Sequence, residues 1–341
     1  MKICVCGGGN LGHVTAGFFA SHGHEVCILT SRPHEWNSTI EVFDCNGKIL
    51  VGILSQCSSV PQDVIPDSEM VLICLPGYAI ANTLEAIKPF LGSDTIVGTV
   101  VSSTGFFFEA FKILPQQQPL FGLQRVPFIS RILDYGKRAE LKGYKKELFV
   151  AIENTTQKDD IRQELEFLFQ TPVFLLNSFY EVSLSNSNPL LHPARLYTMW
   201  KDWTPDVSYT TNPAFYEDWT QEASDLLIAM DKEFQSLIKT IGLREGCIPT
   251  ILKYYGCTDA LSLTNKICSI AAFKGILSPM SVKADGLYIP DFHSRYFTED
   301  FPYGMRFIVE IAELCNVEIP AIQEVYKWGI SHINILNKKC E

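Results

Sequence analysis

The sequence predicts an α/β protein, in which a doubly wound parallel sheet forms the first domain and a mainly α-helical second domain follows. The 341 residues leave room for two domains. Short apolar runs alternate with helical segments through the first half, whereas helical periodicity dominates the second half. Hydrophobic residues are 47% and charged residues 19% of the chain, which predicts a large core rather than disorder. We place the domains at residues 1–177 and 178–341.

Strands and helices are expected to alternate in the first domain. The run Met70–Leu75 is apolar throughout, as in a parallel strand that is buried on both faces. Other strands are expected at 3–6, 25–30, 95–100, 148–152 and 172–176, with a small strand or hairpin at 48–53. Helices are expected at 11–21, 80–91 and 160–169. This order is typical of a parallel sheet with helices on both faces.

The second domain is expected to consist of amphipathic helices. The segment 217–241 has apolar residues at helical intervals, and Gly242 follows it as a C-terminal cap. Further helices are expected at 258–272, 303–315 and 319–336.

The first strand runs directly into a glycine-rich turn with the pattern G-x-G-x-x-G, formed by Gly7, Gly9 and Gly12. Gly7 allows a sharp turn, Gly9 lets the backbone approach a pyrophosphate, and Gly12 lets the helix pack closely on the strand. The N–H groups at the helix start, around Asn10 and Leu11, are expected to hold the phosphate charge. The motif therefore predicts a Rossmann-type dinucleotide-binding domain; the alternative is the same turn in a fold that has lost its ligand.

The end of the second strand indicates which dinucleotide is bound. An NAD site places a carboxylate there to hold the ribose 2′-hydroxyl, but this chain has Ser31 and Arg32 at that position. A guanidinium group suits phosphate oxygens, so the sequence favours NADP over NAD. The alternative is that Arg32 is a solvated residue or stacks on the adenine, and that Glu35 reaches the ribose.

The ligand cleft is expected between the two domains, outside the carboxyl ends of the strands. Leu75 and Pro76 lie at the end of a buried strand and are expected to line the cofactor side of that cleft. An ordinary tight turn is the alternative for these two residues.

Two segments of the second domain combine residues that suit catalysis. Asn188 and His192 lie in a proline-containing apolar segment, where a lone histidine is more often part of the core than a catalyst. Arg295 and Asp300 lie among aromatic residues just before a helix, a pattern that a capping turn with a solvated ion pair also explains.

Together with the glycine turn, these two segments resemble the octopine/nopaline (opine) dehydrogenases. The similarity rests on Asn188 and His192-Pro193, and on Arg295-x-x-x-x-Asp300-x-Pro302-Tyr303-Gly304. It covers nearly the whole chain and keeps the order of the domains. It implies a second domain similar to the C-terminal domain of 6-phosphogluconate dehydrogenase. The chain departs from the family at Arg32, where some members have a clear acid.

The resemblance implies a reductive condensation of an amino acid with a 2-oxo acid, in which the nicotinamide supplies a hydride. His192 would exchange a proton with the reacting atom, and Asp300 would hold the other ring nitrogen. Arg295 would bind the carboxylate of the oxo acid through its planar fork. Asn188 would bind the substrate or the nicotinamide amide.

Two other functions fit part of the sequence. A ketopantoate reductase-like or 6-phosphogluconate dehydrogenase-like enzyme typically uses a lysine as its acid or base, and Lys201, Lys253 and Lys266 lie in the helical domain without a recognisable motif. A non-catalytic dinucleotide-binding protein would keep the glycines but would not need His192 and Asp300 together.

Composition excludes several classes of partner. The net charge of −10 disfavours nucleic acid, and no apolar run is long enough to span a bilayer. The 11 cysteines show no zinc-ligand spacing and no C-x-x-C pair, so we expect no metal and reduced thiols in the cytoplasm. The long amphipathic helices leave room for a homodimer face.

Overall fold

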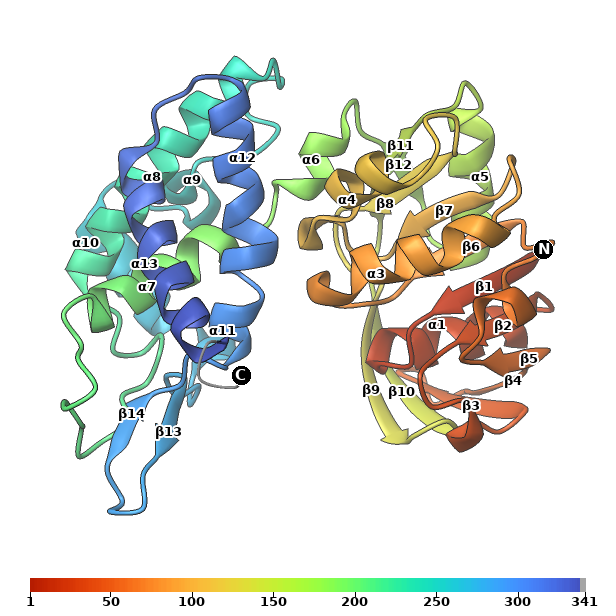
Figure 1. Ribbon diagram of the computed structural model, residues 1–341, viewed down its shortest axis with the longest axis horizontal. Coiled ribbons are helices and arrows are strands. Elements are labelled where there is room, and N and C mark those ends of the chain that lie inside the picture. The colour runs from red at the N-terminus through yellow and green to blue at the C-terminus, as the bar shows by residue number, and fades with distance from the viewer. Residues whose placement is uncertain (338–341) are drawn as a thin grey trace. The chain divides into compact units, whose positions relative to one another are not determined.

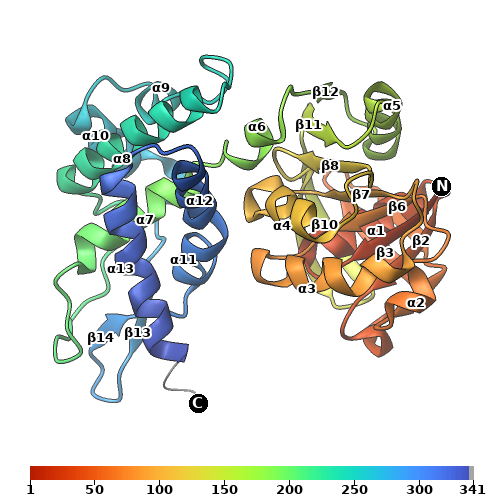
Figure 2. The same ribbon diagram turned by 45° about the horizontal axis from the view of Figure 1, so that its top comes forward.

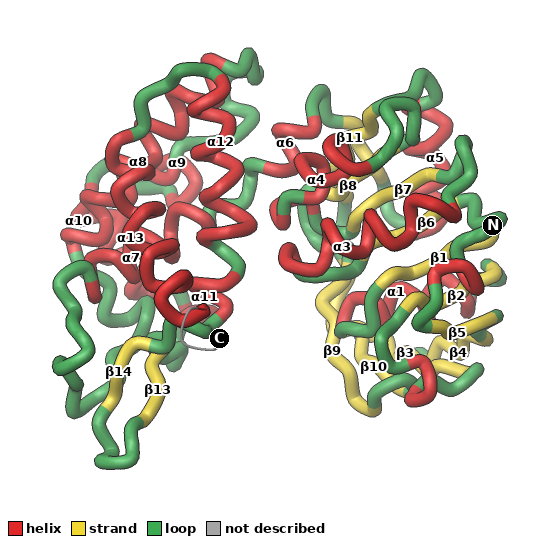
Figure 3. Tube along the Cα trace, viewed as in Figure 1, coloured by secondary structure: helices red, strands yellow, loops and turns green. Residues whose placement is uncertain are grey.

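The computed structural model describes residues 1–337 of the protein. It divides into two compact units, the first ending at Ser185 and the second beginning at Asn186. Strands dominate the first unit, and the second is helical apart from one hairpin (Figures 1 and 3). The first unit extends beyond the predicted boundary at 177, because helix α6 (Phe179–Ser183) packs on the strand Leu148–Glu153 of that unit.

The first unit is built on an eight-stranded sheet with the order β12-β11-β8-β7-β6-β1-β2-β5. Neighbouring strands are parallel except β8 and β11, which run antiparallel, so the sheet is mixed rather than wholly parallel. A hairpin of the strands Phe128–Asp134 and Arg138–Tyr144 lies between these two strands in the chain. The strands are β1 (Lys2–Cys6), β2 (Glu25–Leu29), β5 (Gln56–Ser58), β6 (Met70–Ile73), β7 (Ile96–Thr99), β8 (Leu120–Leu123), β11 (Leu148–Glu153) and β12 (Val173–Leu175).

Helices cover both faces of this sheet, which confirms the doubly wound arrangement. The alternation of side chains along β1 shows the two layers: Ile3 and Val5 face one core, and Cys4 and Cys6 face the other. Helices α1 (Asn10–Ser21) and α5 (Lys158–Phe169) pack on the first core. The opposite core receives α2 (Pro61–Val64), α3 (Gly77–Ile87) and α4 (Phe106–Ile113).

A second, four-stranded sheet packs against the outer side of α1. Its order is β4-β3-β10-β9, with β3 (Thr39–Asp44), β4 (Ile49–Ile53), β9 (Phe128–Asp134) and β10 (Arg138–Tyr144). Strands β3 and β10 pair in parallel although they are far apart in the chain. Helix α1 is therefore enclosed between the two sheets. The sequence predicted the strand at 48–53, but not the other three strands of this sheet.

The second unit is organised around helix α7, which packs against α8 and α13 (Figure 2). The predicted segment 217–241 forms α8 and ends at Gly242, whose φ of +76° fits the predicted cap. The helices are α7 (Asn188–Trp200), α8 (Gln221–Thr240), α9 (Ile251–Tyr255), α10 (Ala260–Ser269), α11 (Arg295–Thr298), α12 (Arg306–Leu314) and α13 (Pro320–Asn337), with the hairpin β13 (Met280–Val282) and β14 (Tyr288–Pro290).

Short irregular helices complete both units. A π-helical turn at Phe301–Met305 precedes α12, so the predicted helix at 303–315 begins in a wider turn. Four 3₁₀ turns are Pro33–Glu35, Lys88–Phe90, Ser102–Thr104 and Ala271–Phe273. No helix within residues 1–337 has the length and apolar character needed to cross a bilayer.

Candidate functional site

A cavity of about 740 Å³ opens at the carboxyl ends of β1, β2 and β6 in the first unit. This is the edge of the sheet where open α/β folds bind their ligands. Six of the residues predicted to bind the cofactor line the cavity: Gly7, Gly9, Ser31, Arg32, Leu75 and Pro76.

The three glycines of the turn have the properties that a pyrophosphate site needs. Gly7 has a φ of +124°, and a Cβ on Gly12 would lie 1.9 Å from the carbonyl oxygen of Gly7. By contrast, a Cβ on Gly9 would meet no atom within 4 Å. Gly9 also begins α1 without a side-chain cap, so the first N–H groups of the helix have no side-chain acceptor there. The turn therefore offers open space beside donors that suit a phosphate.

Asn10 and Leu11 lie in the first turn of α1 but do not line the cavity with their side chains. The side-chain oxygen of Asn10 accepts a hydrogen bond from the backbone N–H of Ile132 at 2.8 Å, so it holds strand β9. The half-buried Leu11 packs against the core of the first unit. What these two residues can offer a pyrophosphate is their backbone N–H groups.

The predicted 2′-phosphate position contains one cation and one anion. Nη1 of Arg32 lies 3.4 Å from Oε2 of Glu35, and both side chains are exposed. The guanidinium also lies 3.8 Å from the ring centroid of Tyr135, which lines the same cavity. Arg32 is thus not a fully solvated loop residue, because an aromatic ring holds it at the cavity wall.

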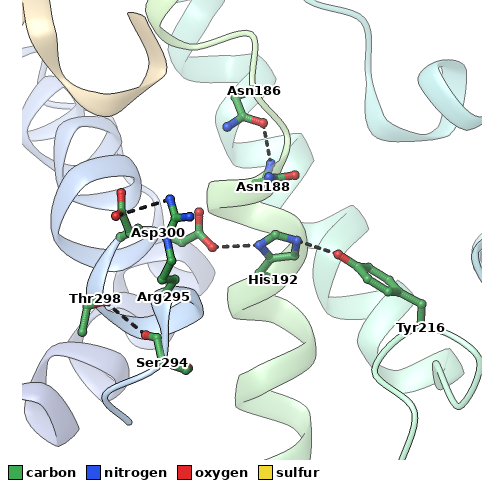
Figure 4. A network of polar contacts seen from close by, with 9 residues as sticks. Asn186, Asn188, His192, Tyr216, Ser294, Arg295, Thr298 and Asp300 are labelled. Atoms are coloured by element: carbon green, nitrogen blue, oxygen red, sulfur yellow. Dashed lines mark hydrogen bonds and ion pairs between the residues drawn. The ribbon is translucent and has the colours of Figure 1, made fainter. Parts of the chain in front are cut away.

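The second unit holds a histidine between two oxygen atoms (Figure 4). Nδ1 of His192 lies 2.7 Å from Oδ2 of Asp300, and its Nε2 lies 2.8 Å from the hydroxyl of Tyr216. His192 is 8% exposed, so most water is excluded from these contacts. The side chains come from α7, from the turn after α11, and from the loop before α8.

The local sequence explains how Asp300 and Tyr216 reach His192. A Cβ on Gly304 would lie 2.6 Å from Cγ of Pro189, so only glycine lets the turn after Asp300 sit this close to α7. On the other side, the buried Arg195 donates from Nε to the carbonyl of Phe215 at 3.2 Å and from Nη2 to that of Asp218 at 2.6 Å. Arg195 thereby fixes the loop that carries Tyr216.

This arrangement fits a general acid–base group. An ionised Asp300 can only accept, so Nδ1 of a neutral His192 carries the proton and Nε2 is the acceptor. Burial raises the pKa of the Tyr216 phenol well above its usual range, so Tyr216 is a neutral donor to Nε2. A carboxylate that orients an imidazole in this way also stabilises the imidazolium once it has taken a proton.

Arg295 and Asn188 lie near this pair (Figure 4), and the contacts described for them are with other residues. The Arg295 side chain is 85% exposed, and its Nη2 lies 3.5 Å from Oε1 of Glu299. In Figure 4 it lies on the same side of His192 as Asp300. Asn188 begins α7, one helical turn before His192, and its backbone N–H donates to Oδ1 of Asn186 at 3.2 Å. Both side chains therefore belong to the neighbourhood of His192 rather than to its hydrogen-bonded core.

Sequence reasoning missed three residues of this cluster: Tyr216, Tyr296 and Arg195. The Tyr296 ring packs edge-on against His192, with 4.7 Å between the ring centroids. The two tyrosines lie in aromatic-rich segments that are typical of a hydrophobic core. They belong to no sequence motif with a fixed spacing that would distinguish them. Arg195 had a usable signal, because it follows His192 by nearly one helical turn in the segment that the sequence already singled out.

The lysines of the rival mechanism lie on the surface. Lys201, Lys253 and Lys266 are all exposed, and Lys201 pairs with Glu222 at 2.7 Å. Within residues 1–337, no three His, Cys, Asp or Glu side chains are grouped so that they could hold a metal ion.

Two family models match the chain. The model of the NAD/NADP octopine/nopaline dehydrogenase α-helical domain matches residues 175–332, and that of ketopantoate reductase PanE/ApbA matches residues 3–129. A solved ketopantoate reductase from Ralstonia eutropha, at 14% identity and a TM-score of 0.63, covers 96% of this chain and 97% of its own. At that identity the likeness shows the fold alone.

Several relatives that match over both domains are opine dehydrogenases. The chain is 28% identical to tauropine dehydrogenase of Arabella iricolor, over 96% of this chain and 90% of that protein. It is 27% identical to octopine dehydrogenase of Pecten maximus, over 96% and 89%. A structure of octopine dehydrogenase with NADH and L-arginine superposes with a TM-score of 0.87 at 26% identity, covering 98% of this chain and 90% of that one. The helical domain therefore matches the octopine/nopaline dehydrogenase family, and nearly the whole chain is similar to the opine dehydrogenases, which are NAD(P)-dependent oxidoreductases.

Proposed function

We propose that this protein condenses an amino acid with a 2-oxo acid and reduces the product to a secondary amine dicarboxylate. The amine and the carbonyl lose water to form an imine, and the protonated imine accepts a hydride at carbon. The observation that supports this reaction best is the buried pair of His192 and Asp300, 2.7 Å apart, in the domain that matches the opine dehydrogenases.

Each predicted residue has a role in this reaction. His192 exchanges a proton with the reacting oxygen or nitrogen through Nε2, while Asp300 orients the ring. Arg295 binds the carboxylate of the oxo acid, for which its exposed guanidinium is available alongside the Glu299 pair. Asn188 hydrogen-bonds the substrate or the nicotinamide amide.

The cofactor we propose is NADP, with NAD as the alternative. Gly7, Gly9 and Gly12 with the N–H groups of Asn10 and Leu11 would hold the pyrophosphate. Ser31 and Arg32 would bind the 2′-phosphate, and Leu75 and Pro76 would line the cavity beside the cofactor. When bound, the nicotinamide supplies or accepts the hydride. A related octopine dehydrogenase was solved with NADH, so a direct comparison of the two cofactors is needed.

One assay separates this function from its rivals. Oxidation of NADPH should require an amine and an oxo acid together, beginning with arginine and pyruvate, with which octopine dehydrogenase was solved. Oxidation with an oxo acid alone would instead support a ketopantoate reductase-like enzyme, which the match over residues 3–129 favours. Cofactor binding without turnover over a broad panel would support a non-catalytic binding protein. A clearly lower KM for NADH than for NADPH would refute the NADP preference.

We also propose a cytoplasmic enzyme that can form a homodimer. The cytoplasm keeps thiols reduced, which suits a β1 strand whose Cys4 and Cys6 are buried as small apolar residues. Sedimentation of the purified protein over a range of concentrations tests the dimer.

A further inference from the structure

The residue we single out is Tyr135, at the tip of the β9–β10 hairpin. This hairpin belongs to the four-stranded sheet, yet Tyr135 lines the cavity at the end of β2. Its ring lies 3.8 Å from the guanidinium carbon of Arg32. A Cβ built on Gly8 would lie 2.4 Å from its hydroxyl, so the ring extends from Arg32 to the glycine turn.

Two hydrogen bonds attach the hairpin to the first turn of α1. The side-chain oxygen of Asn10 accepts from Ile132 N–H at 2.8 Å. His13 is fully buried, and its Nε2 accepts from Gly136 N–H at 2.7 Å while its Nδ1 lies 3.0 Å from the carbonyl of Gly9. Because Nε2 accepts, Nδ1 carries the proton and donates to Gly9. The neutral ring of His13 therefore connects the glycine turn to the residue after Tyr135.

The loop after β2 is attached to the same hairpin. The backbone N–H of Asn37 donates to the carbonyl of Gly136 at 3.0 Å. A Cβ on Gly136, whose φ is +70°, would lie 2.0 Å from the carbonyl oxygen of Glu35. Only glycine permits this approach, and it fixes Tyr135 relative to Arg32 and Glu35. Three segments that are distant in sequence thus meet around Tyr135.

Two interactions compete for the Arg32 side chain at this point. Glu35, at 3.4 Å, draws the guanidinium toward the exposed turn, whereas the Tyr135 ring keeps it against the cavity wall. A 2′-phosphate carries more charge than the Glu35 carboxylate and presents three oxygens, so it would replace Glu35 as the partner of a guanidinium held in this position. A cofactor with a 2′-hydroxyl gains little from that cation.

We propose that Tyr135 is a specificity-determining residue, whose ring holds Arg32 where it binds the 2′-phosphate of a dinucleotide. The inference rests on the dinucleotide site and on the NADP preference proposed above, and it adds a residue from outside the βαβ unit to that site. The role belongs to the ring face, since a guanidinium stacks on the face of an aromatic ring.

The test uses the full-length protein with 2′-phospho-ADP-ribose and ADP-ribose, and it measures dissociation constants by calorimetry. Neither ligand carries nicotinamide, so binding is independent of the reaction. We expect the wild type to bind the 2′-phosphate ligand more tightly. Tyr135→Leu should weaken its binding by about threefold, in line with a stacked cation, and should change ADP-ribose binding by less than twofold. Tyr135→Phe keeps the ring and should retain the preference.

Three further variants control the test. Tyr78→Leu removes another tyrosine that lines the same cavity and should leave the preference unchanged. Arg32→Met should abolish the preference, and adding Tyr135→Leu to it should cause no further selective loss. Arg32→Met also tests the proposal if Tyr135→Leu fails to fold.

Four results overturn the inference: a wild type that prefers ADP-ribose, equal weakening of both ligands by Tyr135→Leu, a preference that the loss of the ring leaves undiminished, or a preference that survives Arg32→Met. Binding of neither ligand would remove the dinucleotide site itself. Normal binding with no turnover on amine and oxo acid would refute the proposed reaction and leave the role of Tyr135 standing.

Discussion

His192 and Asp300 form a buried hydrogen-bonded pair, with 2.7 Å between Nδ1 and Oδ2 and only 10% and 16% of the two side chains exposed. The pair joins α7 to the turn after α11, so its geometry depends on the packing of the helical unit. Because Asp300 engages Nδ1, the only nitrogen left to face a substrate is Nε2.

Replacing Asp300 by Asn should leave the fold intact and lower kcat by about 10³-fold or more. The amide keeps the size of the carboxylate but has no charge to stabilise an imidazolium, and it can hold the ring in the wrong tautomer. Steady-state kinetics with saturating cofactor measures this. A kcat within a few-fold of wild type would show that Asp300 is only structural.

Replacing His192 by Gln should abolish most turnover, by about 10²–10⁴-fold, without weakening cofactor binding. The cavity that we assign to the cofactor is lined by residues 6–135, none of which is in the helical unit. Quenching of protein fluorescence by NADPH reports binding separately from rate. If activity and binding fall together, His192 contributes to cofactor binding or to folding.

Replacing Tyr216 by Phe should keep kcat within about threefold and lower KM for the oxo acid. In the structure its hydroxyl lies 2.8 Å from Nε2 of His192, in the position that the reacting atom of a substrate would have to take. Removing the hydroxyl removes that competition while the ring keeps its stacking on Phe273. A loss of 100-fold in kcat would mean instead that the Tyr216 hydroxyl transmits the proton.

Changing Arg295 to Lys should raise KM for the oxo acid by about tenfold, since an ammonium cannot form the planar two-point contact with a carboxylate. Thermal stability should hardly change, because the ion pair with Glu299 involves an exposed side chain. Arg162→Lys is the matched control: it alters another i,i+4 Arg–Glu pair, in the first unit, and should leave every KM unchanged. An unaltered KM in Arg295→Lys would remove Arg295 from the substrate site.

The two glycines Gly9 and Gly12 should respond differently to a methyl group. Gly9→Ala should preserve the melting temperature and weaken cofactor binding, since its Cβ would enter the open space proposed for the pyrophosphate. Gly12→Ala should destabilise the fold, because its Cβ would lie 1.9 Å from a backbone oxygen. Calorimetric melting with and without NADPH distinguishes the two effects. Equal losses of stability in both variants would contradict the assignment.

The central strands and the longest helices could be predicted from local patterns, whereas short elements such as β8 and α4 were missed. Continuous apolar runs such as Met70–Leu75 marked the central strands, and helical spacing marked α8 and α13. The second sheet could not be predicted in this way, because β10 pairs with β3 and the contact that makes each a strand is supplied from far along the chain. Helix α7 was also missed as a helix, since Pro193 in its interior obscures the periodic signal.

The residues of the candidate site also differ in whether local sequence patterns could predict them. The glycine turn follows a local rule and could be located from sequence. The pairing of His192 with Asp300 came from a resemblance to a family, because no spacing rule joins residues on separate elements. Tyr216 and Tyr135 act through tertiary contacts made by loops, and their sequence surroundings resemble those of ordinary core or turn residues.

Enclosing α1 between two sheets has a mechanical consequence. The glycine turn that we propose for the pyrophosphate leads directly into this enclosed helix, so it should be among the last parts of the first unit to open in native-state hydrogen exchange. A nucleotide would then encounter a rigid, preorganised cradle and lose little binding free energy to ordering it.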